Sequence, residues 1–270
     1  MMNTKEWQGI WVVAEQINGN LSSVSCELLG KAQELKSQNK FKPTITAVIL
    51  GHEVKNLAQE LANHGAEEII VAESPDLKYF QNESYALVLE EMIIEYKPAV
   101  VLIGATGIGS DLAPTLGAKL RTGVAAHCID LRMNDEGNLV SVVPAFGGKV
   151  LGDILCPNHR PQIATVKAGV MDTICSTGNQ RGVIVDYDPN PALMKDKGRV
   201  KALGIHQEKI KGIPLEKAEV VVAGGWGIGC KEDWGLLVEL ADLLGGAVGC
   251  TRPALDEGWA EGEHQMIGTS

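Results

Sequence analysis

The segment Thr44–Leu50, TITAVIL, holds an apolar or β-branched residue at every position. A strand with one wet face would alternate polar and apolar residues, so this run predicts a strand that is buried on both faces. Helical spacing of apolar residues flanks it on both sides, at Val24, Leu28, Ala32 and Leu35 before it and at Val54, Leu57, Ala58 and Leu61 after it. This order of helix, buried strand and helix indicates a parallel sheet that is covered by helices on both faces.

The same alternation continues along the first two thirds of the chain. Further apolar strands and one long helix are predicted at Ile10–Ala14, Ile69–Ala72, Ala99–Ile103 and, for the helix, Tyr85–Tyr96. From Val124 to Val166 the pattern changes to short extended segments joined by turns, which predicts antiparallel strands added to one edge of the sheet. Residues 1–186 are therefore expected to form a Rossmann-like α/β domain with a mostly parallel sheet.

A second, smaller α/β domain is expected after a linker. Residues 187–217 are rich in proline and charge, which is typical of a connecting segment. Residues 218–270 then contain one unit of strand, loop, helix and strand. The apolar residues of its helix predict a buried stripe, formed by Leu236, Leu237, Leu240, Ala241 and Leu244. Because one such unit cannot cover both faces of its strands, we expect this second domain to be incomplete.

Composition limits the classes of partner. The formal charge of −10 disfavours binding to nucleic acid or to anionic membranes. No apolar run is long enough to span a bilayer, and the polar start of the chain has no signal core, so we expect a cytoplasmic protein without membrane insertion. The six cysteines are scattered, with no C-x-x-C pair and no histidine at zinc-ligand spacing, so we expect free thiols and no metal site.

A glycine-rich turn at Gly104–Asp111, GATGIGSD, follows a predicted strand and opens a predicted helix. Its glycines permit a tight turn, and the free backbone amides at a helix start can bind an anion. An ordinary turn whose helix is capped by Ser110 or Asp111 explains the same residues equally well. The sequence leaves both interpretations open.

A second glycine loop, AGGWGIGC at Ala223–Cys230, also joins a strand to a helix. In dinucleotide-binding loops such glycines let backbone amides approach a pyrophosphate. The spacing here departs from G-x-G-x-x-G, and glycine loops after strands are common. An NAD site would also place an acidic residue at the end of the next strand to bind the ribose, but this chain has Thr251 and Arg252 there.

Thr251 and Arg252 favour an electron-rich ligand over a ribose diol. Beside a flavin ring, a guanidinium group would stabilise the reduced, anionic form by charge attraction and so raise its reduction potential. The alternative is a surface guanidinium or one that pairs with Asp256. The position of Arg252 at a strand end, opposite the glycine loop, favours the flavin interpretation.

Several motifs, taken in order, resemble the alpha subunit of electron-transfer flavoproteins, and the resemblance covers essentially all 270 residues. In the first domain these motifs are Trp11–Glu15, Gly104–Pro114 and Arg160–Val166. In the second domain they are Ala223–Gly227, Leu240–Asp242, Ala247–Arg252 and Asp256–Trp259.

The resemblance implies FAD as the cofactor. The residues that would line its pyrophosphate are Gly224, Gly225 and Gly227, those beside its isoalloxazine ring are Thr251 and Arg252, and those that begin a further flavin loop are Gly268, Thr269 and Ser270. Trp226 stands where the family commonly has arginine, so an aromatic face replaces a cation near the cofactor. Family members continue past this loop with more flavin contacts, so FAD held by these residues alone is expected to be weakly bound.

The resemblance also implies an electron carrier that pairs with a beta subunit through its first domain and works with a dehydrogenase or other redox partner. Electron carriage needs no general base or nucleophile. The sequence agrees, since it contains neither a G-x-S-x-G elbow nor an H-E-x-x-H motif, and no catalytic residue is expected. Two alternatives are a nicotinamide-dependent oxidoreductase and a nucleotide-binding regulatory module that uses Gly104–Asp111.

Overall fold

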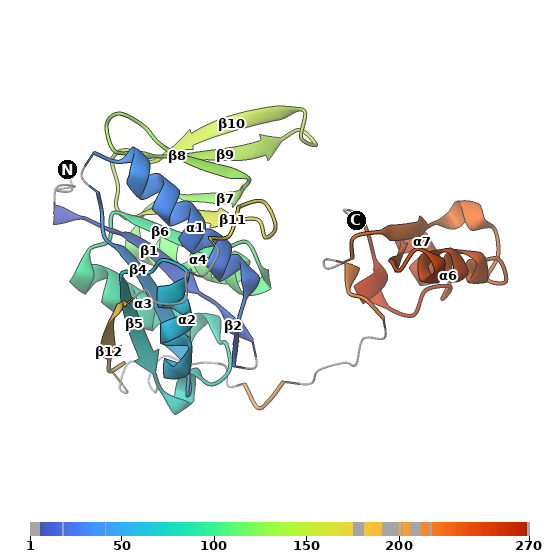
Figure 1. Ribbon diagram of the computed structural model, residues 1–270, viewed down its shortest axis with the longest axis horizontal. Helices are drawn as coiled ribbons and strands as arrows, with labels where there is room; N and C mark the ends of the chain where they lie inside the picture. The colour runs from blue at the N-terminus through green and yellow to red at the C-terminus, as the bar shows by residue number, and fades with distance from the viewer. Residues whose placement is uncertain are drawn as a thin grey trace. The chain divides into compact units, whose positions relative to one another are not determined.

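The chain forms two compact units, residues 1–205 and 206–270, in the computed structural model (Figure 1). The structure describes residues 6–17, 19–40, 42–174, 181–190, 200, 202–205, 212–215 and 218–268.

The first unit is built on a seven-stranded sheet with the order β12-β5-β4-β1-β6-β11-β7, in which all neighbouring strands are parallel. The strands are β1 (Ile10–Ala14), β4 (Ile45–Gly51), β5 (Glu68–Glu73), β6 (Val100–Gly104), β7 (Val124–Cys128), β11 (Gln162–Val166) and β12 (Val183–Tyr187). Every residue of β1, β4 and β6 is buried, which confirms the prediction from TITAVIL of a sheet covered on both faces.

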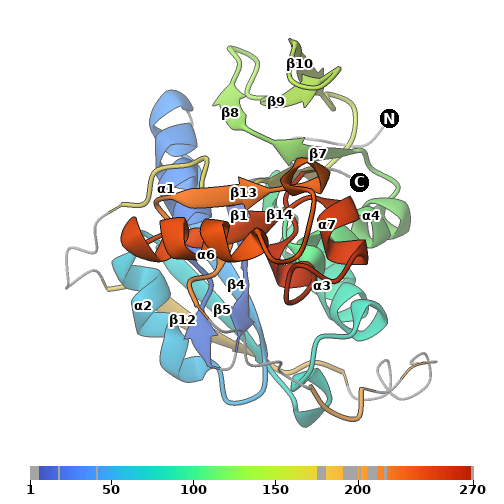
Figure 2. The same cartoon turned by 90° about the vertical axis from the view of Figure 1, so that its right-hand side faces the viewer.

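Four helices cover the two faces of this sheet, and Figure 2 shows α1 and α2 on one side of it and α3 and α4 on the other. They are α1 (Ser23–Gln38), α2 (Ala58–Asn63), α3 (Asn82–Tyr96) and α4 (Gly107–Leu120). A 3-10 turn, η2 (Lys55–Leu57), precedes α2. Among the described helices, none combines the length and the apolar run that crossing a lipid bilayer requires.

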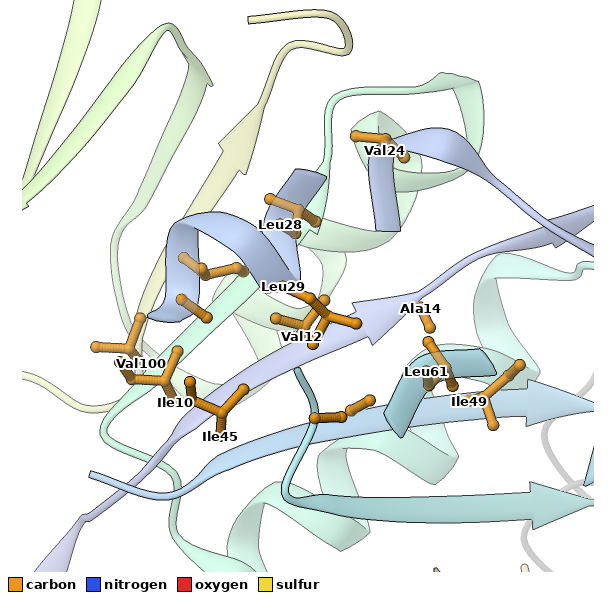
Figure 3. Close-up of a cluster of buried hydrophobic side chains, with 14 of the residues drawn as sticks. Ile10, Val12, Ala14, Val24, Leu28, Leu29, Ile45, Ile49, Leu61 and Val100 are labelled. Atoms are coloured by element: carbon orange, nitrogen blue, oxygen red, sulfur yellow. The ribbon is translucent and has the colours of Figure 1, made fainter. Parts of the chain in front are cut away.

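Side chains of β1 alternate between the two cores, as the pleat of a strand requires. Val12 and Ala14 belong to the cluster that includes Leu28 of α1 and Leu61 of α2 (Figure 3), whereas Trp11 and Val13 belong to the cluster formed with α3 and α4. Leu28 and Leu61 are fully buried, and burial of such a side chain contributes about 1.5–3 kcal/mol to stability. The two cores fix the sheet between its helices and hold the carboxyl ends of β1, β4 and β6 side by side.

The segment from Val124 to Val166 differs in part from its prediction. Its middle forms a separate antiparallel sheet of β8 (Asp130–Met133), β9 (Leu139–Ala145) and β10 (Val150–Leu155), which projects from the first unit (Figure 1). Its two outer strands, β7 and β11, instead join the main sheet in parallel, so an antiparallel pairing for them was wrong. The projecting sheet serves as the crossover between them, a role that a helix fills elsewhere in this unit.

The second unit contains β13 (Val221–Gly224), α6 (Trp234–Leu243), β14 (Ala247–Cys250) and α7 (Arg252–Asp256), with β13 and β14 parallel. The predicted buried stripe of its helix was wrong at three positions. Leu236 is 65% exposed, Leu240 46% and Leu244 53%. The helix α6 carries apolar side chains on more than one of its sides. The two-stranded sheet contacts the side that carries Trp234, Leu237 and Ala241.

Candidate functional site

The predicted cofactor residues of the second unit gather at the carboxyl ends of its two parallel strands. Gly224 of β13 lies opposite Cys250 of β14, and the amide of Thr251 donates to the carbonyl of Gly224 at 3.0 Å. The glycine loop and the Thr251-Arg252 pair therefore adjoin each other. In open α/β sheets this carboxyl edge is where ligands bind.

The three predicted glycines have different local reasons for lacking a side chain. A Cβ at Gly224 would overlap Leu237 and Trp234, so this glycine permits α6 to pack on β13. A Cβ at Gly225 would lie 2.8 Å from Thr251 Oγ1, so this glycine permits the two strand ends to touch. A Cβ at Gly227 would meet nothing within 4 Å, which leaves the backbone there open to close approach by a ligand.

Arg252 adopts the alternative that the sequence left open. Its Nε donates to Asp256 Oδ1 at 2.9 Å across one turn of α7, and both side chains are more than half exposed. An exposed pair of this kind contributes at most about 1 kcal/mol. The guanidinium is therefore held near the strand end by a weak interaction that a stronger anionic partner can replace.

Trp226 begins the 3-10 turn η5 (Trp226–Ile228) directly after Gly225 and stacks on Trp259, with ring centroids 6.0 Å apart and planes 24° apart. Trp259 in turn lies 6.4 Å from the buried ring of Trp234. The stack fixes the loop on the small core of this unit, and Trp226 remains 61% exposed. An exposed indole face beside a glycine loop is a surface on which a planar ring can stack.

Gly268 reaches the same edge of the sheet. Met266 forms a parallel bridge with Cys250, and the amide of Ile267 donates to the carbonyl of Cys250 at 2.8 Å. Gly268 follows with φ +90°, a conformation that favours glycine, and has no atoms near its Cβ position. The other two predicted residues of this loop, Thr269 and Ser270, lie outside the described residues.

These observations agree with the needs of a dinucleotide. The edge offers open backbone at Gly227 and Gly268, a hydroxyl at Thr251 and a guanidinium at Arg252. Phosphates accept hydrogen bonds from backbone amides and from cations, and a flat ring requires an apolar or aromatic surface. The residues present therefore fit FAD.

The glycine turn of the first unit has a different structure. Thr106, rather than Ser110 or Asp111, is the N-cap of α4, and its hydroxyl accepts a hydrogen bond from the Gly109 amide at 3.0 Å. The same hydroxyl lies 2.8 Å from Glu15 Oε2. The carboxylate of Glu15 thus lies beside this helix start, where it would repel a phosphate, and this favours the capped turn over the phosphate-binding interpretation.

Glu15 is a buried ionisable group of this region. It is 6% exposed at the end of β1, and burial raises the pKa of its carboxyl above the ordinary value of 4.5, with the Thr106 hydroxyl opposing part of that rise. The five described cysteines are free, and among the described residues no three His, Cys, Asp or Glu side chains lie close enough to hold a metal ion.

Comparison with known families decides between the interpretations of this edge. Residues 10–192 match the electron transfer flavoprotein domain, and residues 214–270 match the electron transfer flavoprotein FAD-binding domain. The chain belongs to the electron transfer flavoprotein alpha subunit family. The predictions of family, fold class and FAD as cofactor are confirmed.

Several alpha subunits are similar to this chain over nearly its whole length. It is 39% identical to the electron transfer flavoprotein subunit alpha of Thermoanaerobacterium thermosaccharolyticum over 97% of this chain and 78% of that protein. It is also 39% identical to protein FixB of Clostridium saccharobutylicum, over 98% of this chain and 78% of that protein. A third relative is subunit LctC of the lactate dehydrogenase (NAD(+),ferredoxin) of Acetobacterium woodii, at 36% identity over 96% of this chain and 61% of that subunit.

Sequence reasoning missed two features at these sites. The Thr106 cap carried a local signal, because a threonine directly before a helix is a favoured N-cap, but the neighbouring Ser110 and Asp111 carried a similar one. The stacking of Trp226 on Trp259 carried no local signal, since 32 intervening residues separate the two side chains.

Proposed function

We propose that this chain acts as an electron carrier rather than as an enzyme on its own, and that it works as one subunit of a heterodimer with a beta subunit of the same family. The chain accepts electrons into FAD from one redox protein and passes them to another. The observation that carries the proposal is the convergence of open glycine backbone, a hydroxyl and a guanidinium at one edge of the FAD-binding domain. Bound FAD supplies the electron-accepting ring, and the protein supplies position and charge.

Each predicted site residue except Gly224, which permits α6 to pack on β13, has a proposed role toward the cofactor. The amides of Gly225 and Gly227 face the phosphates, Thr251 donates its hydroxyl, and Arg252 exchanges Asp256 for the electron-rich part of the cofactor. Trp226 offers its exposed face to a planar ring. Gly268, Thr269 and Ser270 form a further contact with the cofactor at the neighbouring strand end.

The first domain, residues 1–186, is the proposed surface for the beta subunit, with residues 187–217 as the linker and 218–270 as the FAD-binding part. Support comes from β10, whose apolar side chains are exposed. Val150 is 52% exposed, Leu151 59% and Ile154 44%, and Phe146 in the preceding turn is 83% exposed. A cluster of exposed apolar side chains on a projecting sheet is typical of a protein interface.

The redox partners are proposed to be a dehydrogenase or reductase and a second redox protein. Two relatives carry names of this kind, the lactate dehydrogenase subunit LctC and the acryloyl-CoA reductase electron transfer subunit of Anaerotignum propionicum. We further propose the cytoplasm as the compartment, in accord with the free thiols of the described cysteines.

Co-expression with a beta subunit of the family tests this function. The purified complex is expected to show the visible bands of oxidised flavin and to lose them when a reducing dehydrogenase is added. A colourless complex that binds NADH would contradict the proposal. Leu151→Asp is expected to prevent capture of the beta subunit, whereas Ile94→Asp, at a 56% exposed position on α3, is the matched control.

A further inference from the structure

A cavity of about 430 Å³ lies in the first unit, and none of the residues that line it is proposed to contact FAD. Its wall includes Val13 and Glu15 at the end of β1, Leu50 at the end of β4 and Ile103 at the end of β6. Between β1 and β6 the strand order reverses direction, since β4 and β5 lie on one side of β1 and β6 on the other. This switch point is where open parallel sheets bind small molecules, and the cavity has the size of such sites.

Carboxylates lie at two helix starts of this edge. At α4 the Glu15 carboxylate lies on the Thr106 cap, as described above. At η2 the carboxylate of Glu73 accepts from the amides of Val54 at 2.6 Å and Lys55 at 3.0 Å. Of these two carboxylates, that of Glu15 lines the cavity, so a phosphate placed beside Thr106 would meet a negative charge.

The remaining wall is largely aromatic and apolar, which suits a flat molecule, and it also includes His52 and Lys78, whose ammonium lies 5.5 Å from the centroid of the Tyr79 ring. Tyr79, Phe80 and Tyr85 supply aromatic surface, and Phe80 packs edge-on against Tyr85 with centroids 5.1 Å apart. The Tyr85 hydroxyl donates to the carbonyl of Leu77 at 2.9 Å, so its ring rather than its polar end is available. Leu112 and Ile108 of α4 complete an apolar side.

Glu15 is the polar group to which such a molecule can bind. Its side chain is buried, and among the described residues the Thr106 hydroxyl is the side-chain donor that it meets. A carboxylate offers about four acceptor positions, so most of its capacity is open toward donors on a ligand. Amino or hydroxyl groups on a heterocycle or sugar provide such donors.

We propose that this cavity binds an uncharged nucleoside, whose flat base packs on the aromatic wall and whose amino or hydroxyl groups donate to Glu15. The site is distinct from the FAD site, and the proposal stands whether or not the proposed electron transfer is correct. The absence of a phosphate on the ligand follows from the carboxylate of Glu15, which lines the cavity beside the Thr106 cap.

Calorimetric titration of the full chain with adenosine, guanosine and AMP tests the proposal. At least one nucleoside is expected to bind saturably with a Kd below about 1 mM, with AMP binding about tenfold or more weakly than adenosine. No saturable binding by either nucleoside, or equal binding of AMP and adenosine, would overturn the proposal.

Variants locate the bound nucleoside and separate this cavity from the FAD site. Ile108→Trp fills the cavity from a half-buried position and is expected to abolish binding, whereas Ile94→Trp is the matched control outside the cavity. Glu15→Gln is expected to weaken binding about tenfold, because it replaces a charged acceptor. Binding that survives Ile108→Trp in a protein with an unchanged circular dichroism spectrum would place the nucleoside elsewhere and overturn the proposal.

Discussion

The hydroxyl oxygen of Thr106 lies 2.8 Å from Glu15 Oε2, so one residue both caps α4 and holds the buried carboxylate at the end of β1. The pair joins two neighbouring strand ends across the switch point of the sheet. The pair also places a carboxylate beside a glycine turn whose sequence resembles a phosphate-binding loop.

Replacement of Thr106 is expected to destabilise the first unit. Thr106→Ala removes the N-cap, which costs about 0.5–2 kcal/mol, and it also leaves Glu15 buried without this donor. Chemical denaturation followed by circular dichroism measures the loss. Thr106→Ser keeps the hydroxyl and is the matched control, so an equal loss in both variants would show that the hydroxyl has no role.

The stability of the first unit is expected to depend on the protonation of Glu15. Burial raises the pKa of this carboxyl in the folded state above 4.5, with the Thr106 hydroxyl opposing the rise, so the folded state binds the proton more tightly than the unfolded state. The free energy of unfolding contributed by this group is therefore highest below pH 4.5 and decreases as the pH rises through the folded-state pKa. The other titratable groups that line the same cavity are His52, Lys78, Tyr79 and Tyr85.

Glu15→Gln isolates this effect, because glutamine cannot ionise. Relative to the unmodified protein, the variant is expected to gain stability as the pH is raised from 4.5 through the folded-state pKa of Glu15. Thermal unfolding at a series of pH values measures the difference. Glu136→Gln, at an exposed turn position, is the control; a difference for Glu15→Gln that is as flat as that of the control would contradict the prediction.

The central part of the fold was predictable because its signal is local. The Ile45–Leu50 part of TITAVIL lies in β4 with every residue buried, and Thr44 precedes the strand and is exposed. The helices on either side of this strand appeared where apolar residues recur at helical spacing. A strand that is buried on both faces consists almost entirely of apolar residues, so its burial can be predicted from its own composition. The composition of a strand does not identify the strands that pair with it. For this reason β7 and β11 could be predicted as strands but not as parallel neighbours in the main sheet.

The candidate site, like the fold, could be predicted in part from the sequence. The glycine loop and the strand end at Thr251 could be placed together, because parallel strands of one unit end at the same edge. The exposed sides of α6 could not be foreseen, since apolar periodicity reports the preference of a helix for burial and not the width of the sheet beneath it. The pairing of Arg252 with Asp256 was foreseen only as an alternative, because spacing of four residues permits the contact without requiring it.

Replacement by alanine is expected to have different effects at Gly224 and at Gly227, two glycines of the loop. Gly224→Ala would push against Leu237 and Trp234, and overpacking of this kind costs about 1–3 kcal/mol. Gly227→Ala meets no neighbouring atom, so the fold of the second unit should be unchanged while the content of bound FAD decreases. Tryptophan fluorescence reports the first effect and the flavin absorbance of the purified complex the second. Full FAD content in a folded Gly227→Ala protein would remove this backbone from the site.

Arg252 is expected to set the reduction potential of the bound flavin. Removal of a cation near the ring would destabilise the reduced form by about 1–4 kcal/mol, which is roughly 20–90 mV for a two-electron couple, so Arg252→Ala lowers the potential. Asp256→Asn removes the anion that now holds the guanidinium, and it is expected to shift the potential upward. Lys40→Ala removes an exposed cation from the first unit and is the control for a change of net charge. Spectroelectrochemical titration of the complex distinguishes these outcomes, because a potential that is unchanged in Arg252→Ala and in Asp256→Asn would assign Arg252 to the protein surface alone.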